Sequence, residues 1–295
     1  MKKKTGFVSI IGRPSSGKST LVNTICGYKI SIVSKHPQTT RFLVKGIYND
    51  DESQIVFLDT PGYHNFNSQL NKTLSTLAVK SANEGDLIMY VVDMTREFGE
   101  EENAILDKIK YFGIKIVVVF NKSDDQQHIV PGIKEEILKR IKPAGHIEVS
   151  ALKNDNINTL IDQLKNNLEY GDIYFPEEYV TDQDMNFRIS ETVREKVFNN
   201  TSEEIPHSTY VEIETLKVKD DRIIANAVIF VEKDSQKGII IGKGGAMIKK
   251  IGLQARKDLS EIFECEVDLF LHVKVNLNWR KKDDFIKKIY GNDYF

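Results

Sequence analysis

The sequence predicts an α/β domain with a doubly wound, mostly parallel sheet, followed by a smaller α+β domain. Three observations lead to this prediction. Short β-branched, apolar runs alternate with helical patterns in the first half. The second half changes to the order helix, strand, strand, helix, helix, strand. The length of 295 residues also fits two domains better than one.

The expected elements of the first domain alternate along the chain. The strands are expected at residues 7–12, 54–59, 86–93, 115–121 and 146–149. The helices are expected at residues 17–26, 68–84, 100–112, 132–142 and 157–169. Strands separated by helices form a parallel sheet with helices on both faces, and such a sheet binds ligands at the carboxyl ends of its strands.

A stretch rich in Gly, Pro, Asp and Glu separates the two halves, and it is typical of a linker. We therefore expect a first domain at 4–171, a linker at 172–185, a second domain at 186–282 and a C-terminal helix or tail at 283–295. In the second domain, the helices are expected at 187–199 and 246–263 and the strands at 208–217, 222–232 and 266–275. A hairpin turn is expected at 217–222, and a short helix and a glycine loop follow the second strand.

Composition narrows the class of protein. The chain is 40% hydrophobic and 28% charged, and it has no apolar run of 18 residues, so we expect no membrane span. The apolar run at 7–11 is too short for a signal peptide. Cys26 and Cys265 have no partners at metal-ligand spacing. These features predict a cytoplasmic protein with reduced cysteines.

Charge is distributed unevenly. The net charge is −2, which argues against a protein coated in positive charge. Residues 235–257, however, contain six basic residues and no acidic one. This segment predicts contact with a polyanion on one face of the second domain.

A phosphate-binding loop lies between the first expected strand and helix. Residues 12–19 read GRPSSGKS and match the pattern GxxxxGK[ST]. In such loops, backbone amides hold phosphate oxygens, the lysine supplies positive charge, and the last hydroxyl binds Mg²⁺. The expected phosphate contacts are Gly12, Arg13, Pro14, Ser15, Ser16, Gly17, Lys18, Ser19 and Thr20. The loop alone does not distinguish an ATPase, a kinase and a GTPase.

A second motif predicts which base is bound. Residues 121–124 read NKSD and follow an apolar strand. Asp124 can accept two hydrogen bonds from guanine that adenine cannot donate, and unpaired buried polar groups reject the wrong base. Lys122 is expected over the base, and Asn121 is expected to tie this loop to the phosphate loop. The base-contacting set is Asn121, Lys122, Ser123, Asp124, Ser150, Ala151 and Leu152. GTP and GDP are therefore the expected substrate and product.

Two further segments complete the expected site. The motif DTPG ends a strand and supplies Asp59, Thr60, Pro61 and Gly62. Asp59 is expected to hold Mg²⁺ through water, and the Gly62 amide is expected to contact the γ-phosphate. We assign Thr40 to the Mg²⁺ shell, with Ser19; the alternative is that Thr39 and Thr40 start a strand. The expected catalytic groups are Lys18, Thr40 and Gly62.

The residue after Gly62 predicts slow hydrolysis. Ras-like GTPases have a glutamine there that orients the attacking water, and this chain has Tyr63. His64 follows, but phosphoryl transfer needs positioning and charge more than a general base. We therefore interpret His64 as a bystander.

A glycine loop in the second domain predicts RNA binding. Gly242, Lys243, Gly244 and Gly245 form a GxxG loop before an amphipathic helix, as in KH domains that clamp four nucleotides. The expected RNA contacts are Gly242, Lys243, Gly244, Gly245, Lys249, Lys250 and Arg256. The alternatives are a second phosphate loop and a plain helix–helix turn. Trp279 either extends the RNA surface by stacking or packs the end of the domain.

These motifs occur in an order that resembles the Era family of bacterial TrmE-Era-EngA-like GTPases. They are GRPSSGKS, QTTR, DTPGYH, NKSD, SAL and GIIIGKGGAMIKKIG, and the resemblance covers residues 6–282. It implies a P-loop NTPase domain followed by a type II KH domain, with Mg²⁺ as cofactor. It also implies binding to the 3′ end of small-subunit ribosomal RNA and to the 30S subunit, whose assembly it serves. Peripheral contact with the cytoplasmic membrane is implied as well. We expect a monomer that does not bind DNA.

One residue departs from the family pattern. The family has asparagine where this chain has Ser15, and in related GTPases that asparagine helps to hold a K⁺ ion that assists hydrolysis. The shorter side chain predicts weak or absent stimulation by K⁺. Two alternative functions remain at this point: an RNA-holding ribosome factor whose nucleotide is a structural ligand, and a membrane-surface GTPase whose basic segment meets anionic lipid.

Overall fold

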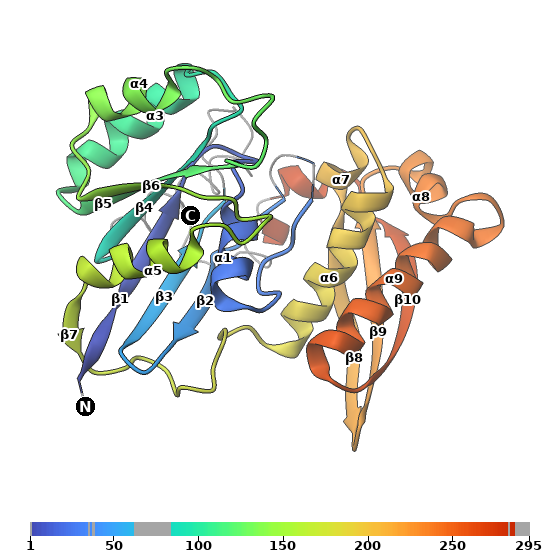
Figure 1. Ribbon diagram of the computed structural model, residues 1–295. Helices are drawn as coiled ribbons and strands as arrows, with labels where there is room; N and C mark the ends of the chain where they lie inside the picture. The colour runs from blue at the N-terminus through green and yellow to red at the C-terminus, as the bar shows by residue number, and fades with distance from the viewer. Residues whose placement is uncertain (1, 35, 37–38, 62–83, 283, 287–295) are drawn as a thin grey trace. The chain divides into compact units, whose positions relative to one another are not determined.

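The computed structural model describes residues 2–34, 36, 39–61, 84–282 and 284–286. It consists of two compact units, drawn in Figure 1. Among the described residues, the first unit contains residues 2–31 and 40–182, and the second contains the rest. The first is an α/β unit and the second an α+β unit, which confirms the expected fold class.

The first unit is built on one mostly parallel sheet. Its strands are β1 (Lys3–Ile11), β2 (Val44–Asn49), β3 (Ser53–Asp59), β4 (Leu87–Asp93), β5 (Lys115–Asn121), β6 (Gly145–Glu148) and β7 (Glu169–Gly171). The strand order is β2-β3-β1-β4-β5-β6, and β7 pairs with the start of β1. β2 and β7 are antiparallel to their neighbours. The sequence did not predict these two strands, because β2 mixes polar and apolar residues and β7 is only three residues long.

Helices cover both faces of this sheet. They are α1 (Lys18–Cys26), α3 (Glu100–Ile109), α4 (Ile133–Arg140) and α5 (Ile157–Asn166). Figure 1 shows α3 and α4 on one face and α1 and α5 on the other. Ile105, Leu106 and Ile137 pack on Tyr90 and Phe120 of the sheet. The helix expected at 68–84 lies almost entirely outside the described residues.

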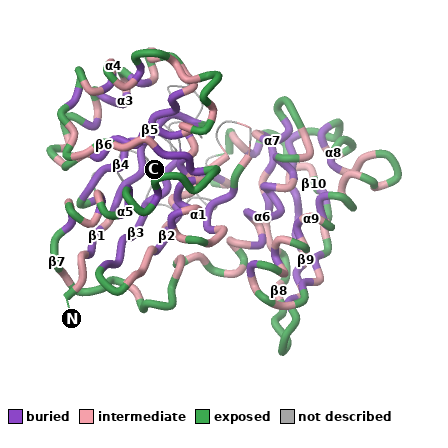
Figure 2. Tube along the Cα trace, in the orientation of Figure 1, coloured by how far each residue is buried: buried purple, intermediate pink, exposed green. Residues whose placement is uncertain are grey.

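The central strands position the site because their carboxyl ends meet at one edge. All residues of β3 and β4 are buried, and Figure 2 shows this central part of the sheet in purple. The register of buried parallel strands is strongly fixed, since a slip of one residue would turn every side chain over. The first residues of the loops that follow β1, β3, β4 and β5 are therefore held at fixed positions relative to one another.

The second unit has a three-stranded sheet with helices. Its elements are α6 (Met185–Asn200), α7 (Ile205–Ser208), β8 (Tyr210–Lys219), β9 (Arg222–Val231), α8 (Asp234–Ile241), α9 (Ala246–Phe263) and β10 (Glu266–Val275). β9 is central, antiparallel to β8 and parallel to β10. Apart from the short α7, this is the expected order. The hairpin turn lies at residues 220–221, so β8 runs two residues beyond its expected end.

One apolar core holds the second unit together. α6 contributes Val193 and Val197, and α9 contributes Ile251, Ala255 and Leu259, all fully buried. They pack with the inward-facing residues of β9 and β10. The period of the α9 residues is that of an amphipathic helix with one buried face. The opposite face of α9 is left for solvent or a ligand.

Trp279 packs the end of the second unit. Its side chain is fully buried, and its Nε1–H donates to the carbonyl of Ser208 at 2.8 Å. Its ring lies against the rings of Tyr210 and Phe285, with centroids 6.0 and 5.9 Å away. A buried indole cannot stack on a nucleotide, so the RNA-stacking alternative is wrong. Arg280, the next residue, forms an ion pair with Glu232.

None of the described helices is both long enough and apolar enough to cross a lipid bilayer. Cys26 and Cys265 are both unpaired and partly buried. Burial raises the pKa of the Cys26 thiol to about 12, which makes it unreactive as a nucleophile near neutral pH.

Candidate functional site

The loop between β1 and α1 needs glycine at two positions. Gly17 has φ +94°, and a Cβ there would collide with the carboxamide of Asn121. A Cβ on Gly12 would collide with the carbonyl of Val91. Both glycines therefore allow other chain segments to approach the loop closely.

Lys18 is held inside this loop. Its ammonium group donates to the carbonyls of Gly12, at 3.0 Å, and Arg13, at 2.7 Å, and the residue is 6% exposed. Burial lowers the pKa of Lys18 to about 8, while the charges of Asp59 and Glu102 act in the opposite direction. A desolvated cation of this kind gains from a nearby polyphosphate, because the phosphate charge replaces lost hydration.

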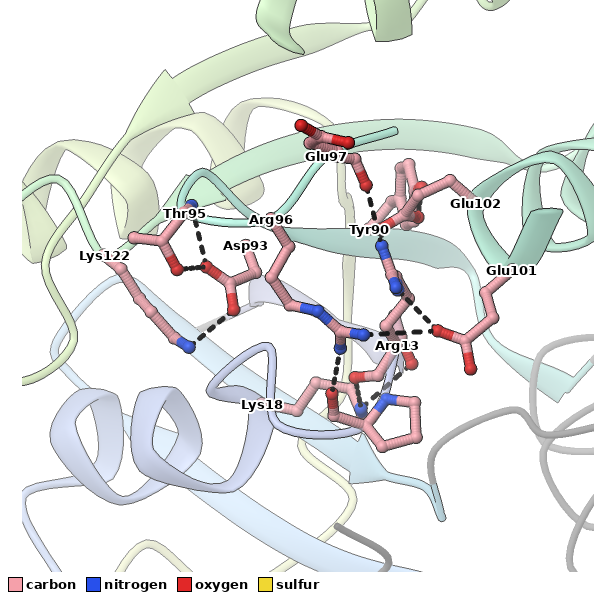
Figure 3. Close-up of polar contacts among 12 residues, drawn as sticks. Arg13, Lys18, Tyr90, Asp93, Thr95, Arg96, Glu97, Glu101, Glu102 and Lys122 are labelled. Carbon is pink, nitrogen blue, oxygen red and sulfur yellow. Dashed lines mark hydrogen bonds and ion pairs between the residues drawn. The ribbon is translucent and has the colours of Figure 1, made fainter. Parts of the chain in front are cut away.

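The side chain of Arg13 ties the phosphate loop to the start of α3. Its Nε donates to Glu101 Oε2 at 2.7 Å and its Nη1 donates to the Glu97 carbonyl at 3.0 Å. The buried carboxylate of Glu102 lies 3.7 Å away and accepts a hydrogen bond from the Tyr90 hydroxyl. Figure 3 shows this network. Arg13 is 8% exposed, so it reaches a ligand through its backbone rather than its guanidinium.

Arg96 makes a second contact to the same loop. From the segment after β4, its Nη1 donates to the Pro14 carbonyl at 3.3 Å, and its Nη2 is 3.7 Å from Glu101 (Figure 3). No sequence motif joins Arg96 or Glu101 to the loop, so their contacts could not be predicted from the sequence.

Hydroxyl and carboxylate oxygens gather at the start of α1. Ser19 Oγ donates to Asp59 Oδ2 at 2.8 Å and lies 2.9 Å from Thr40 Oγ1. Ser31 Oγ, which belongs to none of the sequence motifs, donates to the same carboxylate oxygen at 2.7 Å. The other oxygen, Asp59 Oδ1, is buried and has no hydrogen-bond partner.

These groups fit a magnesium ion. Mg²⁺ prefers hard oxygen ligands and keeps several waters, and a buried, unpaired carboxylate oxygen is costly without a cation or water. Burial raises the pKa of Asp59, whereas the Ser31 hydrogen bond and the charge of Lys18 lower it. A divalent cation beside Asp59 would favour its ionised form.

The two neighbouring threonines between α1 and β2, Thr39 and Thr40, have different hydrogen-bond partners. Thr39 Oγ1 donates to the His36 carbonyl at 2.7 Å and also contacts the Ser34 hydroxyl, while Thr40 contacts Ser19. Neither starts a strand, because β2 begins at Val44, so that alternative is wrong. Thr40 is the one that lies among the oxygen ligands.

Asn121 joins three loops at the end of β5. Its Nδ2 donates to the Ser16 carbonyl at 2.9 Å, and its Oδ1 accepts from the Ala151 N–H at 3.0 Å. In the same region, Ser150 Oγ donates to Asp124 Oδ1 at 2.6 Å. Asp124 is exposed, so its remaining acceptor sites can meet a base.

Lys122 has a partner that the sequence did not indicate. Its ammonium is 2.5 Å from Asp93 Oδ2, and Asp93 also accepts bonds from the N–H and hydroxyl of Thr95 (Figure 3). Asp93 ends β4, next to β5, and is nearly fully buried. This ion pair fixes the stem of Lys122. Ser123 donates its N–H to the Val149 carbonyl at 3.1 Å, which places it beside the Ser150 loop.

Some residues expected to contact the nucleotide have another role in the structure, and others lie outside the described residues. Thr60 is buried, and its hydroxyl donates to the Ile10 carbonyl at 2.8 Å, so it supports the loop internally. Leu152 is 74% exposed. Gly62, Tyr63 and His64 lie outside the described residues.

The GxxG loop of the second unit connects α8 to α9. Gly242, Gly244 and Gly245 have φ angles of +74°, +59° and +80°, values that side chains with a Cβ rarely adopt. A Cβ added to Gly244 would meet nothing within 4 Å. The backbone at Gly244 is therefore open to the approach of another molecule.

Three lysines surround this loop. Lys243, Lys249 and Lys250 are exposed, and none of them forms an ion pair with an acidic residue in the described part of the chain. Arg256 differs, because its Nη1 donates to the Leu269 carbonyl at 2.9 Å and so binds α9 to β10. The exposed positive charge of this surface comes from lysines rather than from Arg256.

Family models match both units. Residues 7–122 match the model described as 50S ribosome-binding GTPase, and residues 204–280 match the model described as KH domain. The two matches lie on the two units and include the phosphate loop and the GxxG loop, respectively.

Curated relatives match almost the entire chain. GTPase Era of Borreliella burgdorferi (strain ZS7) is 46% identical over 287 residues, which are 97% of this chain and 99% of the relative. GTPase Era of Treponema denticola is 44% identical over 290 residues, again 97% and 99%.

Two solved structures also match almost the entire chain. A variant of Aquifex aeolicus Era bound to GDP·AlF₄⁻ has a TM-score of 0.92 and 35% identity, with 98% of this chain and 99% of that chain covered. Era in complex with MgGDPNP and nucleotides 1506–1542 of 16S ribosomal RNA gives the same TM-score and coverage, with 34% identity. The guanine-nucleotide loops, the GxxG loop and these full-length matches together show that the chain belongs to the Era family of GTPases.

Proposed function

We propose that this GTPase is a switch whose second unit binds the 3′ end of small-subunit ribosomal RNA during assembly of the 30S subunit. One observation carries the proposal: a guanine-type site ordered by Asn121 occurs in the same chain as an exposed GxxG loop at Gly244. The Era complex with 16S RNA nucleotides supports this choice of RNA. We place the G domain at 4–171, the linker at 172–185 and the KH domain at 186–282.

Asp124 recognises guanine in this proposal. One of its oxygens is held by Ser150, so the carboxylate has a fixed orientation toward the base. Lys122 covers the base plane, with its charge balanced by Asp93. Guanine satisfies the acceptors of Asp124, whereas adenine would leave them unpaired.

Ser19 and Thr40 would hold Mg²⁺ directly, and Asp59 would hold it through water. Bound there, the ion would supply positive charge to the phosphate oxygens of GTP. Lys18 supplies further positive charge from inside the loop, and backbone N–H groups of residues 12–20, Pro14 excepted because it has none, bind the phosphates. The contact that the sequence predicts between the Gly62 amide and the γ-phosphate lies outside the described residues. Since Tyr63 replaces the water-orienting glutamine, hydrolysis by the protein alone is slow.

The GxxG loop holds the RNA backbone. Its glycines allow sugar–phosphate groups to approach, and Lys243, Lys249 and Lys250 neutralise them. We assign Arg256 to internal packing, because its guanidinium already bonds β10. The loop reads backbone and splayed bases, so it selects single-stranded RNA rather than duplex DNA.

Peripheral membrane contact of a cytoplasmic monomer is a second candidate, because the three exposed lysines could also meet anionic lipid. A filter-binding titration distinguishes binding to ribosomal RNA from binding to a membrane. The protein is titrated with the 16S RNA 3′ end and, separately, with anionic vesicles, each with GTP, GDP or no nucleotide. Tight RNA binding supports the proposal. Binding to vesicles alone would contradict it and favour the membrane.

Asp124→Asn should change base choice. GTP affinity should fall about 100-fold, and xanthosine triphosphate should bind better than GTP, because the amide donates where the carboxylate accepted. Isothermal titration with both nucleotides measures this. Asp125→Asn is the matched control, since that carboxylate bonds His128 instead. Normal GTP affinity in Asp124→Asn would show that the base assignment is wrong.

Ser15 should make hydrolysis indifferent to K⁺. The rate of GTP hydrolysis should agree to about twofold in matched KCl and NaCl, because a serine hydroxyl does not reach as far as a carboxamide. Ser15 has φ +64°, which asparagine tolerates well, so Ser15→Asn should gain K⁺ stimulation without backbone strain. Strong K⁺ preference in the unmodified protein would refute this account.

Gly244→Asp should abolish RNA binding. The carboxylate adds bulk and repels phosphate, so RNA affinity should fall about 100-fold or more while GTP hydrolysis stays within about twofold. Gly113→Asp is the matched control, because Gly113 has φ +66° and also has open space around it. If Gly244→Asp retains full RNA affinity in the filter-binding titration, the loop is not the RNA clamp.

A further inference from the structure

The two oxygens of the Asp59 carboxylate have different surroundings. Both serine hydroxyls that donate to Asp59 reach the same oxygen, Oδ2: Ser19 Oγ at 2.8 Å and Ser31 Oγ at 2.7 Å. The other oxygen, Oδ1, is buried and has no hydrogen-bond partner among the described residues. Two donors on one oxygen restrict rotation of the carboxylate. Oδ1 is therefore the oxygen that is left to accept a hydrogen bond from a water molecule.

The two donors differ in what else they do. Ser19 is assigned to the Mg²⁺ shell, so its hydroxyl oxygen serves the ion as well as Asp59. Ser31 is 2% exposed and belongs to none of the nucleotide motifs. Its hydroxyl therefore bonds Asp59 as part of the protein framework, whether or not an ion is bound.

The backbone of Ser31 is held by one side chain of α1, that of Asn23. Asn23 Oδ1 accepts from the N–H of Ile30 at 2.9 Å and from the N–H of Ser31 at 2.8 Å. Asn23 Nδ2 donates to the Ser31 carbonyl at 2.7 Å. The N–H and the carbonyl of Ser31 are thus bonded to the same carboxamide, which fixes the direction in which the Ser31 side chain leaves the backbone.

The end of α1 explains why Ser31 returns to Asn23. The helix ends at Cys26, and Gly27 follows in the left-handed conformation with φ +65°. The N–H of Tyr28 donates back to the Asn23 carbonyl at 3.2 Å. A left-handed glycine after a helix reverses the chain, so the next residues run back beside the helix. Ile30 is buried there, at 5% exposure, and anchors the returning segment next to Ser31.

We infer that Ser31 is a positioning residue for the metal site. It holds the Asp59 carboxylate in the orientation in which Oδ1 accepts from a water molecule of the Mg²⁺ shell, and Asn23 in turn holds Ser31. Ser31 acts through Asp59 rather than as a ligand itself. The inference rests on the assignment of Asp59 to Mg²⁺ in the proposed function. All of these residues belong to the first unit.

Such a role affects the ion more than the nucleotide. Without the Ser31 hydroxyl, Oδ2 keeps only the bond from Ser19, and the carboxylate must be ordered when the ion binds. Removal of a partner that orients a metal-binding group typically lowers metal affinity about 10- to 100-fold. The phosphate loop and the base loops do not contain Ser31, so nucleotide binding without Mg²⁺ should not change.

The test is isothermal titration of the full-length chain with GDP at a series of free Mg²⁺ concentrations, starting in EDTA. GDP is used because Thr40 is required only in the triphosphate state. The Mg²⁺ concentration at the midpoint of the rise in GDP affinity reports how tightly the complex holds the ion. Ser31→Ala should raise this midpoint about 10-fold, while GDP affinity in EDTA stays within about twofold.

Ser53→Ala is the matched control. Ser53 is the first residue of β3 and Asp59 is the last. Ser53 is also fully buried, and its Oγ donates to Asp50 Oδ1 at 2.9 Å. This variant therefore loses the same kind of bond at the opposite end of the same strand, and its Mg²⁺ midpoint should not change. An equal shift in both variants would overturn the inference, because it would reveal a general loosening of the unit.

A second variant tests the contribution of Asn23. Asn23→Ala should raise the Mg²⁺ midpoint in the same direction as Ser31→Ala. Combined with Ser31→Ala, it should add little, because the hydroxyl that Asn23 positions is already gone. Losses that multiply in the double variant would show that Asn23 does not act through Ser31.

Two results would overturn the role of Ser31. One is an unchanged Mg²⁺ midpoint in Ser31→Ala. The other is an equal loss of GDP affinity with Mg²⁺ and in EDTA, which is the mark of a purely structural residue. Asp59→Asn separates this inference from the assignment beneath it. An unchanged midpoint in Asp59→Asn would remove Asp59 from the metal site, whereas a shift there beside a normal Ser31→Ala would refute the inference alone.

Discussion

The nucleotide site depends on one side chain, the carboxamide of Asn121. It donates to the Ser16 carbonyl of the phosphate loop and accepts from the Ala151 N–H of the second base loop. Gly17 must lack a Cβ for this contact to form. The loops that bind phosphate and base, which come from three strand ends, are thereby held at one separation. The distance from guanine to phosphate is a property of the folded protein before any ligand binds.

The same site contains charges that are costly in the protein alone. Lys18 is desolvated inside the phosphate loop, and Asp59 Oδ1 is buried without a partner. Nucleotide with Mg²⁺ would compensate both, so ligand binding should also stabilise the fold.

Local patterns predicted much of this structure. The loops at 12–19 and 121–124 and the order of the second unit were visible because each depends on residues close in sequence. Strands β2 and β7 were missed, since they gain their structure from pairing rather than from apolar patterns. Ser31 and Asp93 were missed for a related reason. Their partners lie far away along the chain, and no spacing rule connects them.

The central claim is that Asp124 and the loops joined by Asn121 select guanine. The most direct measurement is isothermal titration of the nucleotide-free protein with GTP, GDP and ATP in the presence of Mg²⁺. The account predicts tight binding of both guanine nucleotides and at least about 1,000-fold weaker binding of ATP, because adenine cannot donate the hydrogen bonds that the Asp124 carboxylate accepts from guanine. Equal affinity for ATP and GTP, or a preference for ATP, would contradict it.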